Sequence, residues 1–76
     1  MKTLSDLEPG NRAIIYKILT SSDISRRFLD IGLIENTLVE CVGKSPSGDP
    51  KAYLIRGAVI AIRSEDCKEI YIKEVS

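Results

Sequence analysis

Short apolar runs separated by turn-forming residues recur along the chain, a pattern typical of a small β-rich domain. The breaks fall at residues 8–10, 45–50 and 56–57, which are rich in glycine, proline, serine and aspartate. A short clasp over 3–7 and a single helical turn over 64–67 are also expected. The apolar runs predict strands over 12–19, 37–43, 51–55, 58–62 and 69–73.

The first strand has apolar residues on both faces. Ile14, Tyr16 and Ile18 make one face wholly apolar, while the opposite face mixes Ala13 and Ile15 with polar residues. We therefore expect this strand to be buried on both sides for part of its length.

A short helix is expected between the first two strands. Ile24, Phe28 and Ile31 recur at helical spacing and fall on one face. Ser22 and Asp23 are residue types that cap a helix N-terminus. The apolar face predicts packing against a core, which leaves the polar face of the helix open.

The C-terminal end of this helix is also marked. Gly32 occupies the position where a left-handed residue stops a helix, and Leu33 would then pack back on Phe28 in a Schellman motif. Asn36, in the turn into the next strand, tolerates a positive φ. The helical segment 24–33 is thus predicted to end sharply at its glycine.

These elements predict a closed or nearly closed sheet, because a chain this short cannot otherwise cover its strand edges. We expect a mainly β fold, an SH3-like β-barrel of about five strands with one short α-helix inserted after the first strand, as a single domain over residues 1–76. An OB-like barrel is the alternative. It would normally carry its helix between the third and fourth strands, where this chain has only residues 56–57.

The composition limits the kinds of binding partner that the chain can attract. The 11 basic residues balance the 11 acidic ones, so no overall charge attracts nucleic acid or an anionic membrane, and a charged partner must be met locally. The longest apolar run, 58–62, is far too short to span a bilayer, and Met1 precedes a polar stretch rather than a signal-peptide core. We expect a cytoplasmic protein without direct membrane insertion.

The two cysteines, Cys41 and Cys67, are far apart in the sequence. A secreted domain of this size would usually carry several disulfides, so a reducing compartment fits better. Cys41 lies in an apolar strand and is expected in the core, whereas Cys67 lies in a polar segment and is expected to be half exposed.

Residues for catalysis or metal binding are scarce. The chain has no histidine, and its serines cluster in turns, so no Ser/His or Cys/His pair can form. Two distant cysteines and one methionine do not make a transition-metal site. We expect no enzyme activity, no cofactor and no intrinsic metal site.

The helix carries Arg26 and Arg27 next to each other on its polar side. They can be solvated residues, with Arg27 pairing with Asp23 four residues before it or with Asp30 three residues after it, or they can form a docking surface. Arg56 and Arg63 flank a predicted strand pair and would enlarge a basic patch if all four arginines lay on one side.

Two segments together carry a resemblance to a known family: residues 26–33 (RRFLDIGL), and residues 48–50 (GDP) followed by 56–63 (RGAVIAIR). Residues 4–10 (LSDLEPG) and 70–72 (IYI) fit the same pattern, so nearly the whole chain is covered. In order and spacing these segments resemble the ferrous iron transport protein A (FeoA) domain.

The resemblance implies an SH3-like barrel in the bacterial cytosol that supports FeoB, a membrane ferrous-iron transporter whose cytosolic part contains a GTPase domain. The implied role is protein contact, through which the chain would modulate GTP hydrolysis or transport. The chain departs from the family at Glu35 and Asn36, where proline and glycine are usual, although Asn36 can keep the backbone angle. On this basis we expect Arg26, Arg27, Asp30 and Arg56 to contact the partner, and Phe28, Ile31, Gly32, Leu33 and Gly57 to be structural.

Two other functions stay open at this stage. A small nucleic-acid-binding barrel would fit the size and the scattered arginines, although we expect no nucleic-acid partner. A ferrous-iron chaperone would need Cys41 and Cys67 as ligands. The oligomeric state, including pairing through a barrel edge, is left undecided by the sequence.

Overall fold

The structure, a computed structural model, describes the backbone of residues 2–19 and 22–75, and their side chains except those of 22–25. It contains a short 3₁₀ turn, η1 (Leu4–Asp6), and the helices α1 (Ser22–Asp30) and α2 (Ser64–Cys67). The strands are β1 (Arg12–Ile18), β2 (Leu38–Lys44), β3 (Lys51–Ile55), β4 (Ala58–Ile62) and β5 (Ile70–Val75). The mainly β fold with a short helix after the first strand is confirmed.

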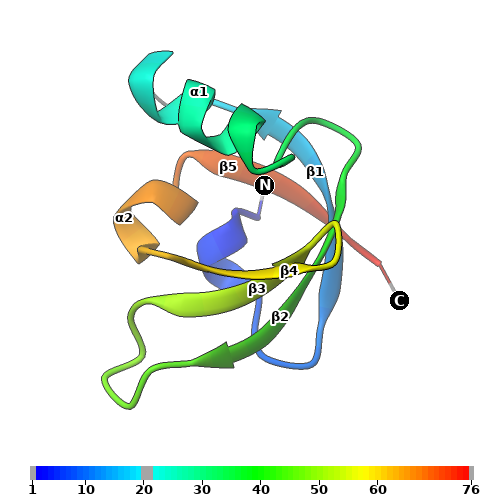
Figure 1. Cartoon of the computed structure of the whole chain (residues 1–76). Helices are drawn as coiled ribbons and strands as arrows, with labels where there is room; N and C mark the ends of the chain where they lie inside the picture. The colour runs from blue at the N-terminus through cyan, green and yellow to red at the C-terminus, as the bar shows by residue number, and fades with distance from the viewer. Residues whose placement is uncertain (1, 20–21, 76) are drawn as a thin grey trace.

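The five strands form one antiparallel sheet in the order β4-β3-β2-β1-β5. Figure 1 shows this sheet curled around η1, with α1 and α2 along its open side. Strands β3 and β4 agree with the predicted ranges at both ends, whereas β5 extends beyond its predicted range to Val75. The sequence therefore predicts which elements form better than where they end.

The predicted burial of β1 is wrong in one respect. Ala13 and Ile15 are fully buried, but Tyr16, on the face expected to be apolar and covered, is 45% exposed. The pairing of β1 with β5 shifts between Ile15 and Lys17, so a β-bulge lies at this point. Because a bulge changes which face the following residues occupy, Ile15 and Ile18 can both pack towards the core.

The core fills the inside of the curled sheet, and the elements outside the sheet contribute to it directly. Leu4 and Leu7 enter from η1 and the residue after it, and Phe28 and Leu33 enter from α1 and its C-terminal turn. The buried apolar residues are Leu4, Leu7, Ala13, Ile15, Phe28, Leu33, Val39, Cys41, Tyr53, Ile55, Ile62, Cys67, Ile70 and Ile72.

Candidate functional site

The C-terminal end of α1 is fixed by the backbone. Gly32 has φ +84°, a conformation that favours glycine. The N–H of Leu33 donates to the Phe28 carbonyl at 2.8 Å, and the N–H of Gly32 donates to the Leu29 carbonyl at 3.0 Å. These two bonds are the Schellman motif expected from the sequence. The cap expected from Ser22 and Asp23 lies outside the described side chains.

The tip of the β3–β4 hairpin is fastened to this end of α1. Arg56 and Gly57 form a two-residue turn with φ +48° and +86°, the combination that a type I′ hairpin requires. Nε of Arg56 donates to the Gly32 carbonyl at 3.1 Å, and an added Cβ on Gly32 would lie only 2.6 Å from Cδ of Arg56. The Arg56 side chain therefore crosses directly over Gly32.

A groove of about 510 Å³ separates α1 from β4 and the start of α2. Phe28 and Ile31 of the helical segment and Ile60 and Ile62 of β4 supply its apolar surface. Ile62 is buried, whereas Ile31 and Ile60 are partly buried. The residues lining the groove are Arg27, Phe28, Asp30, Ile31, Ile60, Ala61, Ile62, Arg63 and Asp66.

The rim of this groove carries both signs of charge. Arg27 and Asp30 come from α1, Arg63 directly precedes α2, and Asp66 lies within α2. Nη1 of Arg63 lies 3.8 Å from Oε1 of Glu65, but both side chains are about three-quarters exposed (76% and 74%), so this pair holds Arg63 only weakly. Opposite charges around an apolar floor are suited to a peptide or protein surface.

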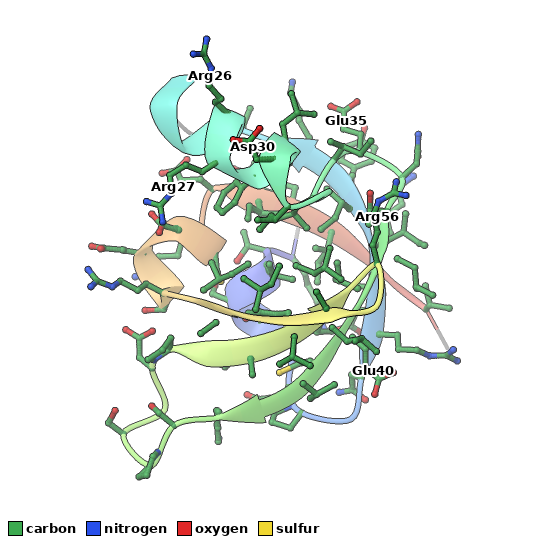
Figure 2. The ribbon with its side chains drawn as sticks, in the orientation of Figure 1. Arg26, Arg27, Asp30, Glu35, Glu40 and Arg56 are labelled. Atoms are coloured by element: carbon green, nitrogen blue, oxygen red, sulfur yellow. The ribbon has the colours of Figure 1, made fainter. Side chains whose placement is uncertain are left out.

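The structure separates the four residues predicted to contact a partner. Arg27 and Asp30 line the groove, whereas Arg26, in the middle of α1, points away from it (Figure 2). Arg56 lies on the opposite side of the molecule from Arg27, beside a second hollow of about 430 Å³ on the outer face of the sheet (Figure 2). Among the described residues, no ion pair joins Arg27 to Asp30.

Sequence reasoning identified Arg63 only as a flanking cation and did not assign Asp66 or Ile60 to the site. Ile60 lies in an apolar run, residues 58–62, that contains no charged residue. Because every residue of this run is apolar, the sequence pattern could not show which of them face the core and which lie exposed at the edge of the sheet. Nothing in the spacing of Asp66 placed it next to α1.

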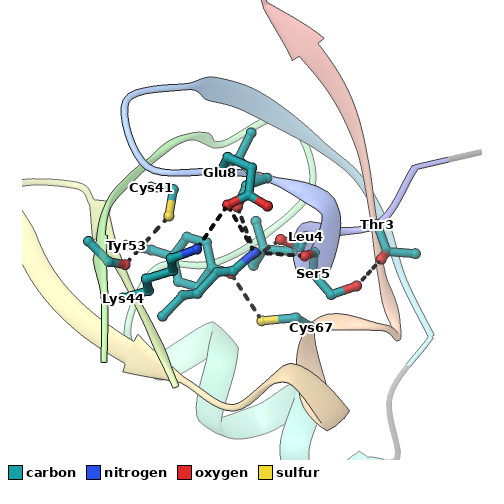
Figure 3. A network of polar contacts seen from close by, with 11 residues as sticks. Thr3, Leu4, Ser5, Glu8, Cys41, Lys44, Tyr53 and Cys67 are labelled. Carbon is teal, nitrogen blue, oxygen red and sulfur yellow. Dashed lines mark hydrogen bonds and ion pairs between the residues drawn. The ribbon is translucent and has the colours of Figure 1, made fainter. Parts of the chain in front are cut away.

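The expected half-exposure of Cys67 is wrong. Cys67 is fully buried, because α2 packs against η1 and directs this side chain inward (Figure 3). Its thiol donates to the Tyr53 hydroxyl at 3.4 Å, and that hydroxyl donates to the Leu4 carbonyl at 3.2 Å. Burial raises the pKa of Cys67 to about 11.

Cys41 is buried as predicted, and burial raises the pKa of its thiol as well. Both thiols are therefore poorly available as thiolate ligands or nucleophiles near neutral pH. Within residues 2–19 and 22–75, no three potential metal-ligating side chains gather in one place. Over the same part of the chain, no helix is long and apolar enough to cross a membrane.

Lys51, the first residue of β3, holds the N-terminal segment 3–7 against the sheet. Its ammonium group, on a side chain only 14% exposed, donates to the Ser5 carbonyl at 2.9 Å and the Leu7 carbonyl at 3.0 Å. Glu8 lies 4.0 Å from the same nitrogen. These contacts bind η1 to β3, so the polar groups in this region stabilise the fold.

The structure is a small β-barrel domain with an open groove between its helix α1 and strand β4. The model of the FeoA domain matches residues 2–74, so the chain belongs to the FeoA family. FeoA of Stenotrophomonas maltophilia, solved in complex with zinc and described as a procaryotic SH3 domain protein, is 26% identical. It has a TM-score of 0.80 over 96% of this chain and 91% of that one. The predicted SH3-like fold is thereby confirmed.

Two further relatives show the contexts in which such a domain occurs. Iron(II) transport protein A from Clostridium thermocellum is 27% identical, with a TM-score of 0.92 over 97% of this chain and 46% of that one. An Fe(2+) transport protein A/Fe(2+) transporter FeoB fusion protein of Porphyromonas gingivalis is 27% identical over 73 residues. The match covers 96% of this chain but only 9% of the fusion protein. Membership of the family links this chain to ferrous iron transport.

Proposed function

We propose that this chain is a non-enzymatic accessory protein of ferrous iron uptake that binds the cytosolic part of a FeoB-like transporter. The observation that carries the proposal is the Porphyromonas gingivalis relative, in which an FeoA segment and the transporter are one polypeptide. A covalent link keeps two domains at high effective concentration, which favours domains that act together. A separate chain such as this one would need a contact surface of its own.

The groove between α1 and β4 is the surface we assign to this contact. Its apolar floor would receive a side chain of the transporter, and the burial of that side chain would supply most of the affinity. Arg27 and Asp30 on one wall and Arg63 and Asp66 on the other would orient the bound segment by charge. Arg26, exposed in the middle of α1, would add long-range attraction.

Arg56 has an indirect role in this proposal. Its side chain is held across Gly32, so it would keep α1 at its distance from β4 and preserve the shape of the groove. The apolar anchors Phe28 and Ile31 act in the same way from beneath the helix. Partner binding would take place in the cytoplasm, and an effect on GTP hydrolysis or transport would follow from it.

The test is a binding measurement between the whole chain and the isolated cytosolic domain of the transporter, with and without a guanine nucleotide. Arg27→Glu should weaken binding by about tenfold at low salt and by less at high salt, because a rim charge acts over distances that salt screens. Lys17→Glu is the matched control, since Lys17 is an exposed cation on β1 and does not line the groove.

Equal affinities for wild type and Arg27→Glu, with both proteins folded, would refute the assigned surface. If the wild-type chain shows no binding in any nucleotide state, the proposed partner is wrong. Titration with RNA and single-stranded DNA at low salt provides a further check, because backbone binding is strongest there. We expect no binding in that titration.

A further inference from the structure

The strand β4 forms one edge of the sheet. Within the described residues it pairs with β3 alone, and Figure 1 shows it as the end strand of the curled sheet, facing α1 across the groove. Its sequence, Ala58–Ile62, contains neither a charged residue nor a proline. Val59 is 64% exposed, although valine is apolar. Such an edge is a template for pairing with another strand.

The other edge of the sheet is protected. Strand β5 carries Lys73 and Glu74, and the N-terminal segment lies along it, with Thr3 bridged to Tyr71. The N–H of Ile72 donates to the Lys2 carbonyl at 3.0 Å. Charges and an added segment are the usual devices against edge pairing. Of the two edges of the sheet, β4 is therefore the less protected one.

The hairpin geometry shows which backbone groups are open for pairing. A two-residue turn closes on a hydrogen-bonded pair, here Ile55 and Ala58. Hydrogen-bonded and non-hydrogen-bonded positions then alternate along β4, so Val59 and Ala61 direct their N–H and C=O groups away from β3. Two residues of a short strand thus present donors and acceptors on its free side.

We propose that the β4 edge pairs with β4 of a second copy of this chain, antiparallel and centred on Ile60. In that register Val59 lies opposite Ala61 of the second copy, and the two exchange backbone hydrogen bonds across the two-fold axis. Ala58 lies opposite Ile62 of the second copy. Every off-centre pair therefore places a small side chain against a large one.

Charge also favours a second copy over a strand of unlike sequence. No charged residue of one β4 lies opposite a charge on the other, and Arg63 lies opposite Gly57 of the second copy. The nearby rim carries two cations and two anions, Arg27, Arg63, Asp30 and Asp66, so the two rims do not repel as a whole. The edge is therefore complementary to itself in both size and charge.

The dimer is weak. Five residues per strand make a small contact, below the area that stable dimers bury, so dissociation should fall between micromolar and millimolar concentration. The second copy and the transporter would both contact residues 60–62 of β4 and would therefore compete for this edge, although self-association itself requires only this chain. If the chain does not self-associate, the proposed transporter contact is unaffected. If the chain does not bind the transporter, the proposed dimer is unaffected.

The test combines sedimentation with amide hydrogen exchange over a range of protein concentrations. The wild-type chain should self-associate, and the amides of Val59 and Ala61 should become protected as concentration rises. Val59→Lys should weaken association by about tenfold or more, because each dimer carries two added charges at its paired edge. Val59 is exposed, so this variant should stay folded.

Val42→Lys is the matched control. Val42 is 42% exposed, but it lies on β2, the middle strand of the order β4-β3-β2-β1-β5, and not on the β4 edge. This variant should associate like the wild type. A chain that stays monomeric to millimolar concentration overturns the proposal, as does an association that Val59→Lys leaves unchanged. Protection of Val59 and Ala61 that arises only when the transporter domain is added would assign the edge to a different partner and overturn it too.

Discussion

Replacement of Gly32 by alanine tests how the end of α1 is held. The substitution acts twice: an L-residue is strained at φ +84°, and its Cβ would lie 2.6 Å from Cδ of Arg56. Because Arg56 has a flexible side chain, it can move aside, but it then loses its hydrogen bond to the Gly32 carbonyl. We expect the helix end to be destabilised while the fold is kept.

The cost of Gly32→Ala has two parts, the backbone strain at residue 32 and the loss of the Arg56 hydrogen bond, and each can be given a magnitude. A left-handed conformation costs an L-residue about 1–2 kcal/mol. The lost hydrogen bond of Arg56 adds about 0.5–1 kcal/mol, at the low end of the range for such bonds because the side chain is exposed. Gly32→Ala should therefore lower the free energy of unfolding by about 2 kcal/mol. In a domain of this size each 1 kcal/mol lowers Tm by about 4–8 °C.

Gly57→Ala is the matched control. Gly57 has nearly the same φ, +86°, but nothing lies within 4 Å of its added Cβ. It should cost only the conformational part, about 1–2 kcal/mol. In an Arg56→Ala background, Gly32→Ala should cost about 0.5–1 kcal/mol less than in the wild type, since the displaced hydrogen bond is already gone.

The assay is urea denaturation of the wild type, Gly32→Ala, Arg56→Ala and the double variant, which form a double-mutant cycle, together with Gly57→Ala. Equal costs for Gly32→Ala with and without Arg56 would show that the two residues are not coupled. The account of Arg56 as the fastener of α1 would then be refuted.

Three further changes test the buried polar contacts and the cap of α2. Tyr53→Phe should lower the free energy of unfolding by about 1–3 kcal/mol in urea titrations, because the buried Leu4 carbonyl loses its donor. Burial raises the pKa of the Cys67 thiol from 9.0 to about 11, so between these values the folded state keeps a proton that the unfolded state releases. The contribution of this thiol to the free energy of unfolding should be complete below pH 9.0 and lost as the pH rises towards 11. Cys67→Ala should make the free energy of unfolding fall less steeply with pH over this range. Asp49→Ala should cost about 0.5–2 kcal/mol by thermal unfolding, since its carboxylate accepts from the N–H of Ser64 at 2.8 Å at the start of α2, and Asp49→Asn should cost less.

Local patterns predicted the elements of this fold well. The left-handed Gly32, the positive φ of Asn36 (+71°) and the glycine turn after β3 all follow from residue types at single positions. Each depends only on its immediate neighbours, which is why the sequence was enough. The buried face of β1 was mispredicted because the bulge before Lys17 depends on how β1 pairs with β5, a distant strand.

The site was harder to predict for the same reason. The groove exists because α1 and β4, which are far apart in the sequence, face each other without touching closely, and no periodicity encodes that distance. Cys67 appeared polar from its neighbours, but α2 turns it towards Tyr53. Arg56 looked like one more exposed cation, although its side chain is held by the Gly32 carbonyl.

The most direct test of the central claim is to map the transporter contact on this chain by NMR. Isotope-labelled chain would be titrated with the unlabelled cytosolic domain of the FeoB-like transporter. The account predicts that the largest backbone shift changes cluster at Arg27, Asp30, Ile60 and Arg63 around the groove. Changes confined to the outer face of the sheet, around Leu38 and Leu54, or no changes at saturating domain, would contradict it.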